Sequence, residues 1–419
     1  MSLTGTDSHR ASPLPLREGD RGRGHSPSPD QSYAESPSPR AGGAPPLPRG
    51  EGQVARLSIT RIQLTNFRSY ANAELEVGTR PVVLAGPNGA GKTNILDAIS
   101  LLAPGRGLRG AKLSEHIRRG PSAPSEALWA VAATVSRGPQ SYDIGTGLMA
   151  GERRAVRLNG VAAQSSADLG EIVQMTWLTP AMDRLFNEGA SGRRRFLDRL
   201  VLGFDPGHAR RSARYETAMR ERARLLKFGP RDPAWLDGLE AEMAEAGAAI
   251  AEARAATVQR LNAMLTQRGN AGAFPCAQLS LDGEAVDEAE LRERFKSCRI
   301  RDAEAGRTTF GPHLADLLVR HTQKRADARE CSTGEQKALL ISIVLADAWE
   351  MARNGFAPLL LLDEIAAHLD MRRRAALFEE ILALGAQAWL TGTDLALFEP
   401  LVSRADIFAV DNGRFASQE

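Results

Sequence analysis

The stretch GPNGAGKTNILDAI, residues 86–99, is a glycine-rich loop that opens directly into an apolar helix. It matches the pattern G-x-x-x-x-G-K-[ST], in which backbone N–H groups and the positive end of the helix hold phosphate oxygens. We expect the Lys92 ammonium to reach the β- and γ-phosphates of ATP and the Thr93 hydroxyl to ligate Mg²⁺. The predicted ATP-binding residues are Gly86, Pro87, Asn88, Gly89, Ala90, Gly91, Lys92 and Thr93.

The flanking sequence supports this interpretation. The run PVVLAG, residues 81–86, has the continuous apolar character of a strand that is buried on both faces. Residues 91–102 have apolar side chains at helical spacing, and residues 57–64 alternate nearly as a half-buried strand does. The order of strand, loop and helix argues against the alternative that this glycine-rich segment is an ordinary turn.

A second run, PLLLLDE at residues 358–364, ends an apolar strand in two acids. Ligands of open α/β sheets bind at the carboxyl ends of the strands. We therefore expect Asp363 to hold Mg²⁺, directly or through water, and Glu364 to polarise the attacking water as a general base. Lys92 is the second predicted catalytic residue. The alternative is a strand that ends in solvated acids.

The segment CSTGEQ, residues 331–336, precedes a strongly apolar helix and has two interpretations. Ser332 and Glu335 have the spacing of a capping box, which would make this simply a good helix start. The same letters match the S-x-G-[GE]-Q signature of ABC-type ATPases, which presents a serine to the γ-phosphate held by a second subunit. The predicted signature residues are Ser332, Gly334, Glu335 and Gln336, about thirty residues before Asp363.

Two further segments follow the acids. Asp370, in AAHLD, lies where a loop would cross a dimer interface, and His368 beside it is a packing or interface residue. Thr393 and Asp394 stand where many ABC-type ATPases carry a γ-phosphate-sensing histidine.

The alternation of strand and helix signals predicts an α/β fold: an ABC-type, SMC-head-like P-loop ATPase lobe split in sequence around a mainly helical second lobe. We expect its N-terminal half at residues 54–180, the helical lobe at 181–300 and its C-terminal half at 301–419. Residues 1–53, rich in Pro, Gly, Ser and Arg, have little to bury and are expected to be disordered. They are either a regulatory or DNA-binding tail or an extension from a misassigned start codon.

Composition excludes some classes of protein. The 53 basic and 51 acidic residues give a net charge of +2, which points to no particular partner. The 3 cysteines form no CxxC pair, so neither a disulfide framework nor a cysteine metal site is expected. No apolar run reaches the length of a membrane span, and we expect a cytoplasmic protein without membrane contact.

The segment 183–231 is dense in arginine and poor in aromatic residues. Arginines that neutralise phosphates would bind the DNA backbone without recognising sequence. The alternative is a solvated helical face with Glu–Arg pairs. The candidate DNA-binding residues are Arg193, Arg194, Arg195, Arg210 and Arg211.

Together, the phosphate loop, GASGRRRFLDRL at 189–200, TGEQKALLISIVLA and LLLLDEIAAHLD resemble the RecF family of bacterial DNA replication and repair proteins. The resemblance extends over residues 54–419 and is closest to α-proteobacterial members. It implies an SMC-like ATPase without the long coiled coil, which dimerises around ATP and binds single-stranded and double-stranded DNA at gaps. It further implies action with RecO and RecR to load RecA, replication restart, induction of the SOS response and weak ATPase activity.

Two rival interpretations stay open at this point. The ATPase subunit of an ABC membrane transporter shares the three motifs, but the histidine is missing and the arginine-rich insertion is unexpected. A structural SMC head would need several hundred residues of heptads. Arg68 lies close to the nucleotide in related proteins and could contact phosphate, and Arg106 and Arg109 could do the same or contact DNA. The alternative for each is an ordinary surface salt bridge. A glutamine that couples the γ-phosphate to the helical lobe is usual in this class, and Gln174 is the candidate by position.

Overall fold

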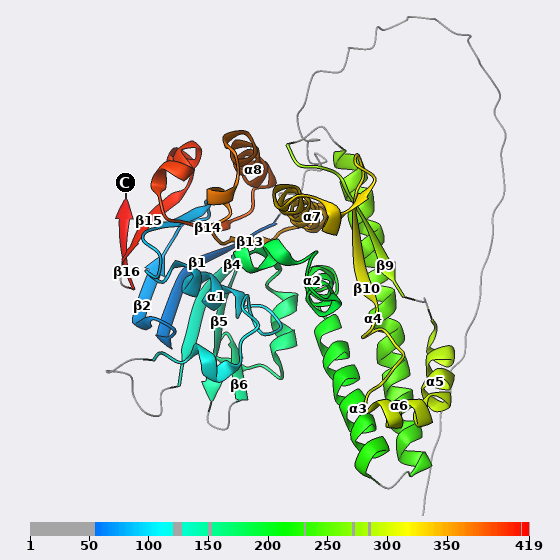
Figure 1. Cartoon of the computed structure of the whole chain (residues 1–419). Coiled ribbons are helices and arrows are strands. Elements are labelled where there is room, and N and C mark those ends of the chain that lie inside the picture. The colour runs from blue at the N-terminus through cyan, green and yellow to red at the C-terminus, as the bar shows by residue number, and fades with distance from the viewer. Residues whose placement is uncertain are drawn as a thin grey trace, which may run out of the picture. The chain divides into compact units, whose positions relative to one another are not determined.

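The structure, a computed structural model, describes residues 55–119, 128–149, 153–229, 232–269, 273–283, 286–411 and 413–418 (Figure 1). The segment 1–53, for which we predicted disorder, lies outside the described residues. Across the described ranges, no helix combines the length and the apolar character that a bilayer crossing requires.

The sheet that carries the phosphate loop has six strands in the order β16-β15-β3-β14-β13-β8. Five run parallel, and β16 is antiparallel to β15. Their bounds are β3 (Val82–Ala85), β8 (Met175–Leu178), β13 (Leu359–Leu362), β14 (Ala388–Gly392), β15 (Asp406–Asp411) and β16 (Arg414–Gln418). Parallel strands bring their carboxyl ends to one edge, so the loop after β3 and the acids after β13 become neighbours.

A second sheet has seven strands, in the order β12-β1-β4-β5-β6-β7 with β2 also paired to β1. Its strands are β1 (Ala55–Phe67), β2 (Tyr70–Glu76), β4 (Ala130–Arg137), β5 (Gln140–Met149), β6 (Arg153–Leu158), β7 (Val161–Ala162) and β12 (Phe356–Ala357). The register of β1 against β4 shifts between Ile59 and Arg61. This irregularity moves the buried side chains from odd to even positions. The alternation of apolar and polar residues in the sequence is therefore interrupted at this point.

Helix α1 (Lys92–Ser100) packs its apolar face into the core that both sheets share, including Leu84 of β3 and Ile62 of β1. Helix α7 (Thr333–Arg353) is buried nearly all round and contacts α4, β8 and β12, while α8 (Met371–Leu384) lies against it. An apolar helix without a polar face has to be covered on every side. Helix α7 thereby joins the ATPase lobe to the helical lobe.

The helical lobe contains α2 (Ala190–Leu202), α3 (His208–Phe228), α4 (Pro233–Arg268), α5 (Glu288–Ser297) and α6 (Arg299–Ala305). Helices α3 and α4 pack side by side along their length (Figure 1). Asp232 caps α4 and Pro233 follows at its first turn, a combination that favours helix initiation. The 36 residues of α4 form one continuous helix, far shorter than a coiled-coil rod.

A three-stranded sheet completes the fold, in the order β11-β10-β9, with β9 (Ala277–Asp282), β10 (Asp316–His321) and β11 (Ala326–Asp327). Strand β9 thus lies inside the segment that we predicted to be mainly helical. Our boundary at residue 300 falls inside α6, whose Asp302 accepts a bond from Arg222 of α3. That side-chain pairing holds α6 in the helical lobe.

Candidate nucleotide-binding site

The phosphate loop has a backbone that only glycine tolerates at two places. Gly86 has φ 156°, and a Cβ there would lie 2.1 Å from the carbonyl oxygen of Val410. Gly91 has φ 111°, and a Cβ there would lie 2.6 Å from the Tyr70 hydroxyl oxygen, which donates a hydrogen bond to the Gly91 carbonyl at 3.0 Å. The loop backbone approaches β15 and β2 so closely that only glycine fits at these two positions, whether or not phosphate is bound.

Lys92 is buried and folds back over its own loop. Its Nζ donates hydrogen bonds of 2.7 Å and 2.9 Å to the carbonyl oxygens of Gly86 and Pro87. Burial lowers the pKa of Lys92, and the charges of Glu364 and Asp363 partly oppose that effect. A cation held among carbonyls at the mouth of the loop is placed to bind an anion.

Asp363 joins the two predicted motifs. Its Oδ1 accepts hydrogen bonds from the Thr93 hydroxyl at 2.9 Å and from the Thr391 hydroxyl at 2.8 Å. The Asp363 side chain is buried, and burial raises its pKa despite these bonds. The predicted magnesium ligands Thr93 and Asp363 are thus in direct contact. Carboxylate and hydroxyl oxygens are the ligands that Mg²⁺ prefers.

Glu364 is half-buried beside this pair and has an unusual backbone. Its φ is 51°, in the left-handed region that costs a non-glycine residue about 1–3 kcal/mol. Its backbone N–H donates to the Thr391 hydroxyl at 2.9 Å, which holds the turn. The same threonine therefore orients both acids. Thr391 was missed from the sequence because a lone threonine near the end of an apolar strand has no motif around it.

Behind the loop, Asp97 of α1 is buried and receives two cationic side chains. Arg68 lies 2.8 Å from the Asp97 carboxylate and Arg109 lies 4.0 Å from it. Burial raises the pKa of Asp97, but His116, 3.4 Å away, and the Arg68 charge outweigh it, so that the net shift is downward. Arg68 is thus tied to a carboxylate beside the loop, Arg106 is exposed, and their predicted phosphate contact stays a prediction.

The signature segment has the geometry of a capped helix start. Ser332 is the N-cap of α7, and its backbone N–H donates to Glu335 at 3.0 Å. Lys324 forms an ion pair with Glu335, and their hydrogen bond lowers the pKa of that carboxyl to about 2. Ser332 and Gly334 are exposed. They are the two members of the predicted signature that lie at the surface.

Gln336 points into the protein. It exchanges hydrogen bonds of 3.1 Å and 3.3 Å with the side chain of Asn187 and donates to the Cys331 carbonyl at 3.0 Å. It is 2 % exposed. We expected a residue that faces a second subunit, and the structure instead uses Gln336 to fasten α7 to the segment before α2.

Asp370 is exposed at the N-cap of α8, where it accepts a bond from the Arg373 backbone N–H at 2.9 Å. Thr393 is exposed and Asp394 caps the 3₁₀ helix η6 (Leu395–Arg404). Gln174 was placed wrongly by sequence reasoning. It precedes β8 and pairs with the amino end of β13, opposite the edge at which Asp363 lies.

The candidate DNA-binding arginines separate into two groups. Arg193 forms a bidentate pair with Asp316 at 2.9 Å and 2.6 Å, Arg194 donates to the Ala315 carbonyl, and Arg211 pairs with Asp205. These three hold the helical lobe together.

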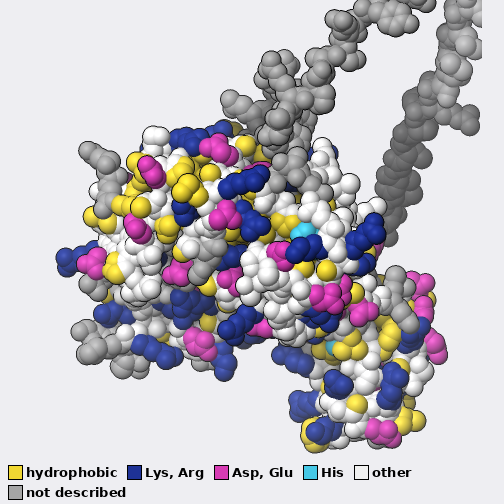
Figure 2. Space-filling model, turned by 45° about the horizontal axis from the view of Figure 1, so that its top comes forward, with side chains coloured by type: hydrophobic (Ala, Val, Ile, Leu, Met, Phe, Trp, Pro, Cys, Tyr) yellow, Lys and Arg dark blue, Asp and Glu magenta, His cyan; other side chains and the backbone are white. Residues whose placement is uncertain are grey.

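The surface charge is mixed. Figure 2 shows Lys and Arg side chains interspersed with Asp and Glu side chains on the face it presents.

Arg195 and Arg210 differ from the other three. Arg195 is exposed and forms no hydrogen bond or ion pair within the described part of the chain. Arg210 has 64 % of its side chain exposed and lies 3.5 Å from Asp168. These two retain cationic groups at the surface, where a phosphate backbone could approach.

Comparisons with known proteins identify the family of this chain. The family model of the RecF/RecN/SMC N-terminal domain matches residues 58–414. A DNA replication and repair protein RecF of Mesorhizobium japonicum is 49% identical over 381 residues, covering 87% of this chain and 99% of its own. The chain belongs to the RecF family. A second RecF, of Agrobacterium fabrum, is 50% identical over 85% of this chain and 98% of its own.

Solved RecF structures share the fold. The recombination mediator protein RecF of the RecFOR pathway, solved with ATP, has a TM-score of 0.75 at 22% identity over 88% of this chain and 100% of its own. An Smc head domain of Pyrococcus furiosus has a TM-score of 0.51 at 18% identity over 87% of this chain and 96% of its own. The ABC-type, SMC-head-like fold is therefore confirmed, and the comparisons do not favour the transporter subunit.

Proposed function

We propose that this chain is an ATP-dependent, DNA-binding recombination mediator with weak ATPase activity. In this proposal it binds single-stranded and double-stranded DNA at gaps and acts with RecO and RecR to load RecA, which supports repair, replication restart and SOS induction. The observation that carries the proposal is the contact between Thr93 of the phosphate loop and Asp363 of the strand that follows 270 positions later. Curated relatives at about half identity are named DNA replication and repair protein RecF.

The residues fit MgATP by their chemistry. Gly86 and Gly91 leave room where a Cβ would strike the neighbouring backbone or side chain, and Lys92 is a buried cation at the loop mouth. Thr93 and Asp363 supply the oxygen ligands for Mg²⁺. A bound Mg²⁺ would neutralise charge that develops on the β- and γ-phosphates. Glu364, oriented through Thr391, would accept the proton of the attacking water.

Exposed Ser332 supports a site completed by a second copy of the chain. As the N-cap of α7, it offers a hydroxyl and a helix N-terminus, both of which favour an anion. In this proposal Ser332 of one chain binds the γ-phosphate held by Lys92 of the other, and Asp370 lies in the loop that crosses the interface. Loss of the γ-phosphate would remove charge-assisted bonds from both chains at once, which reopens the dimer.

The experiment measures the mass of the chain by light scattering with a non-hydrolysable ATP analogue. The wild type is expected to have the mass of two chains, whereas Ser332→Asp is expected to stay at one chain while still binding the analogue. Aspartate keeps the helix cap but repels the phosphate, so the failure is not one of folding. Ser332→Thr, which keeps the hydroxyl, is the matched control.

Lys92→Ala is expected to lose analogue binding and dimerisation together. Normal dimerisation of Ser332→Asp with bound analogue would show that the serine does not act on the second chain. A wild type that keeps the mass of one chain at saturating analogue would contradict the dimer itself.

A further inference from the structure

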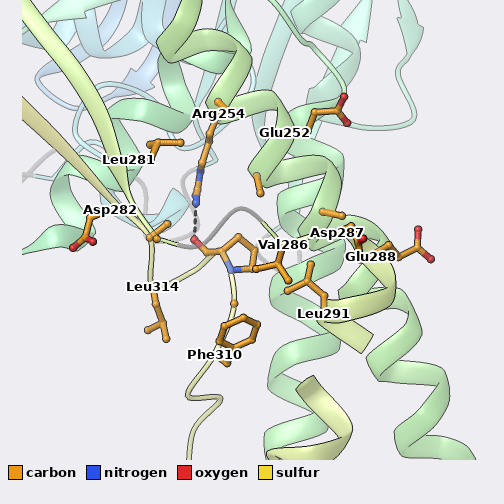
Figure 3. A pocket seen from close by; sticks show the side chains of 17 residues that line it. Glu252, Arg254, Leu281, Asp282, Val286, Asp287, Glu288, Leu291, Phe310 and Leu314 are labelled. Atoms are coloured by element: carbon orange, nitrogen blue, oxygen red, sulfur yellow. Dashed lines mark hydrogen bonds between the residues drawn. The ribbon is translucent and has the colours of Figure 1, made fainter. Parts of the chain in front are cut away.

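The helical lobe contains a pocket of about 860 Å³ between α4, the start of α5 and the loop that leads into β10 (Figure 3). Its lining residues come from the segments 248–255 of α4, 281–283, 286–288, residue 291 and 310–315. None of them belongs to the nucleotide site or to the candidate DNA-binding arginines. The pocket has the size of a binding cleft, and the proposed function leaves it without a role.

The floor of this pocket is apolar and partly open to solvent. Ala248, Ala251 and Ala255 share one face of α4, where their short side chains leave space. Leu291 is buried behind them, Phe310 is half-buried, and Leu314 has 45% of its surface exposed. Covering such apolar groups is favourable by about 25 cal/mol for each Å² removed from water.

The rim of the pocket is acidic. The carboxylates of Glu252, Asp282, Asp287 and Glu288 surround it, and all four residues are exposed (Figure 3). In the described residues, Glu252, Asp282 and Glu288 have no cationic partner, while Asp287 accepts a hydrogen bond from the Glu290 backbone N–H at 2.8 Å. The rim therefore presents several uncompensated negative charges.

The one cation among the lining residues, Arg254, does not neutralise this rim. Its guanidinium donates to the Asp198 carboxylate at 2.7 Å and 2.9 Å and to the Pro312 carbonyl at 2.6 Å. It is 5 % exposed, and Figure 3 draws a hydrogen bond from its guanidinium to a carbonyl oxygen as a dashed line. Arg254 thus secures the wall of the pocket and leaves the carboxylates free for an incoming group.

We propose that this pocket docks a short segment of a partner protein in which two or three apolar side chains are flanked by Lys or Arg. The apolar floor would receive the apolar side chains, and the four carboxylates would pair with the flanking cations. Because carboxylates repel phosphate, we expect this rim to disfavour DNA. The proposal depends only on the pocket and holds whether or not the proposed function does.

The probe is a fluorescein-labelled 14-residue synthetic peptide with three leucines at helical spacing between lysines, titrated with the full chain and followed by fluorescence anisotropy. The comparison peptide has glutamates in place of the lysines. We expect the basic peptide to bind at least tenfold more tightly, and more weakly as salt rises. Leu314→Asp is expected to weaken its binding at least fivefold.

Charge reversal gives the sharper comparison. The double variant Glu252→Lys, Glu288→Lys is expected to lose the preference for the basic peptide or to reverse it. Glu399→Lys, a substitution of an exposed acid on η6 in the ATPase lobe, makes half of that change of charge elsewhere and is expected to leave the preference intact. Melting temperatures of the same samples show that each variant is folded.

Three results would overturn the proposal. The first is equal affinity of the wild type for the two peptides. The second is an unchanged preference in the charge-reversed variant. The third is a change in the light-scattering mass of the nucleotide-free chain on Leu314→Asp, which would mean that a second copy covers the pocket.

Discussion

Thr391 connects the two acids of the candidate site, although it belongs to none of the predicted motifs. Its hydroxyl donates to Asp363 at 2.8 Å and accepts from the Glu364 backbone N–H at 2.9 Å, and the side chain is fully buried. A hydroxyl can donate one hydrogen bond and accept another, so a single small side chain holds the Asp363 carboxylate and the Glu364 backbone N–H together. At the residue scale, then, the geometry of Asp363 and Glu364 depends on a neighbouring strand.

Thr391→Val is expected to reduce ATP hydrolysis roughly tenfold or more and stability by about 1–3 kcal/mol, because a buried acceptor and a buried N–H lose their partner. Thr391→Ser keeps the hydroxyl and is expected to retain most activity. Steady-state hydrolysis and thermal melting of both variants test this. Equal activity of the valine and serine variants would mean that the hydroxyl does not position the two acids.

At the scale of the element, α7 connects the signature serine to the helical lobe. Asp347, 1% exposed, lies in the buried middle of this helix, and its Oδ1 has no hydrogen-bond partner among the described residues. Burial raises the pKa of Asp347 to about 7, although Thr176 and the charge of Arg199 oppose the shift. Arg199 of α2 stacks over the Trp177 ring of β8 at 4.3 Å. Three elements therefore meet around one buried carboxyl.

The raised pKa of Asp347 makes the folded protein less stable as pH rises. Because the folded pKa of about 7 exceeds the ordinary value of 3.8, the neutral acid favours the folded state, and its contribution is lost as pH rises from about 4 to 7. Asp347→Asn imitates the neutral acid. Between about pH 4 and pH 7, the free energy of unfolding of Asp347→Asn is expected to rise relative to that of the wild type by an amount on the order of 2–4 kcal/mol.

Thermal melting of wild type and Asp347→Asn at pH 5, 6, 7 and 8 measures this difference. The gap between the two melting temperatures should widen up to pH 7 and then stay constant. Parallel pH profiles of the two proteins would contradict a neutral Asp347 in the folded chain.

At the scale of the molecule, buried ion pairs determine which arginines remain available to a partner. Arg222, fully buried, bonds Glu240 at 2.9 Å and Asp302 at 2.7 Å, and so joins α3, α4 and α6. Arg193 joins α2 to β10 through Asp316. Arginine density in the sequence therefore overstates the cationic surface.

The two groups of arginines are expected to respond differently to substitution. Arg195→Ala and Arg210→Ala should each lower affinity for gapped duplex DNA and reduce the slope of log K against log salt by about 0.9, with little change in melting temperature. Arg193→Ala should instead destabilise the fold by about 1–3 kcal/mol or more, because Asp316 loses its partner. Salt-dependent electrophoretic binding and thermal melting separate the two effects.

If the slope of log K against log salt were unchanged in both Arg195→Ala and Arg210→Ala, these two residues would not be part of the DNA-binding surface. A fully stable Arg193→Ala with weakened DNA binding would contradict the assignment of Arg193 to the interior.

The sequence by itself determined the strand, loop and helix around residues 86–99 and the acids Asp363 and Glu364. These follow from local periodicity and from motifs whose chemistry requires fixed spacing. The family resemblance was likewise carried by contiguous segments.

Only the tertiary structure decided which polar groups turn inward. It joined Thr391 to Asp363, directed Gln336 at Asn187, placed Gln174 at the opposite edge of the sheet and tied Arg193 to Asp316. Each of these depends on a partner that is distant in sequence or on the direction of a strand in the sheet. Composition and spacing do not contain that information, because a hydrogen bond is selected by the packing that brings its two ends together.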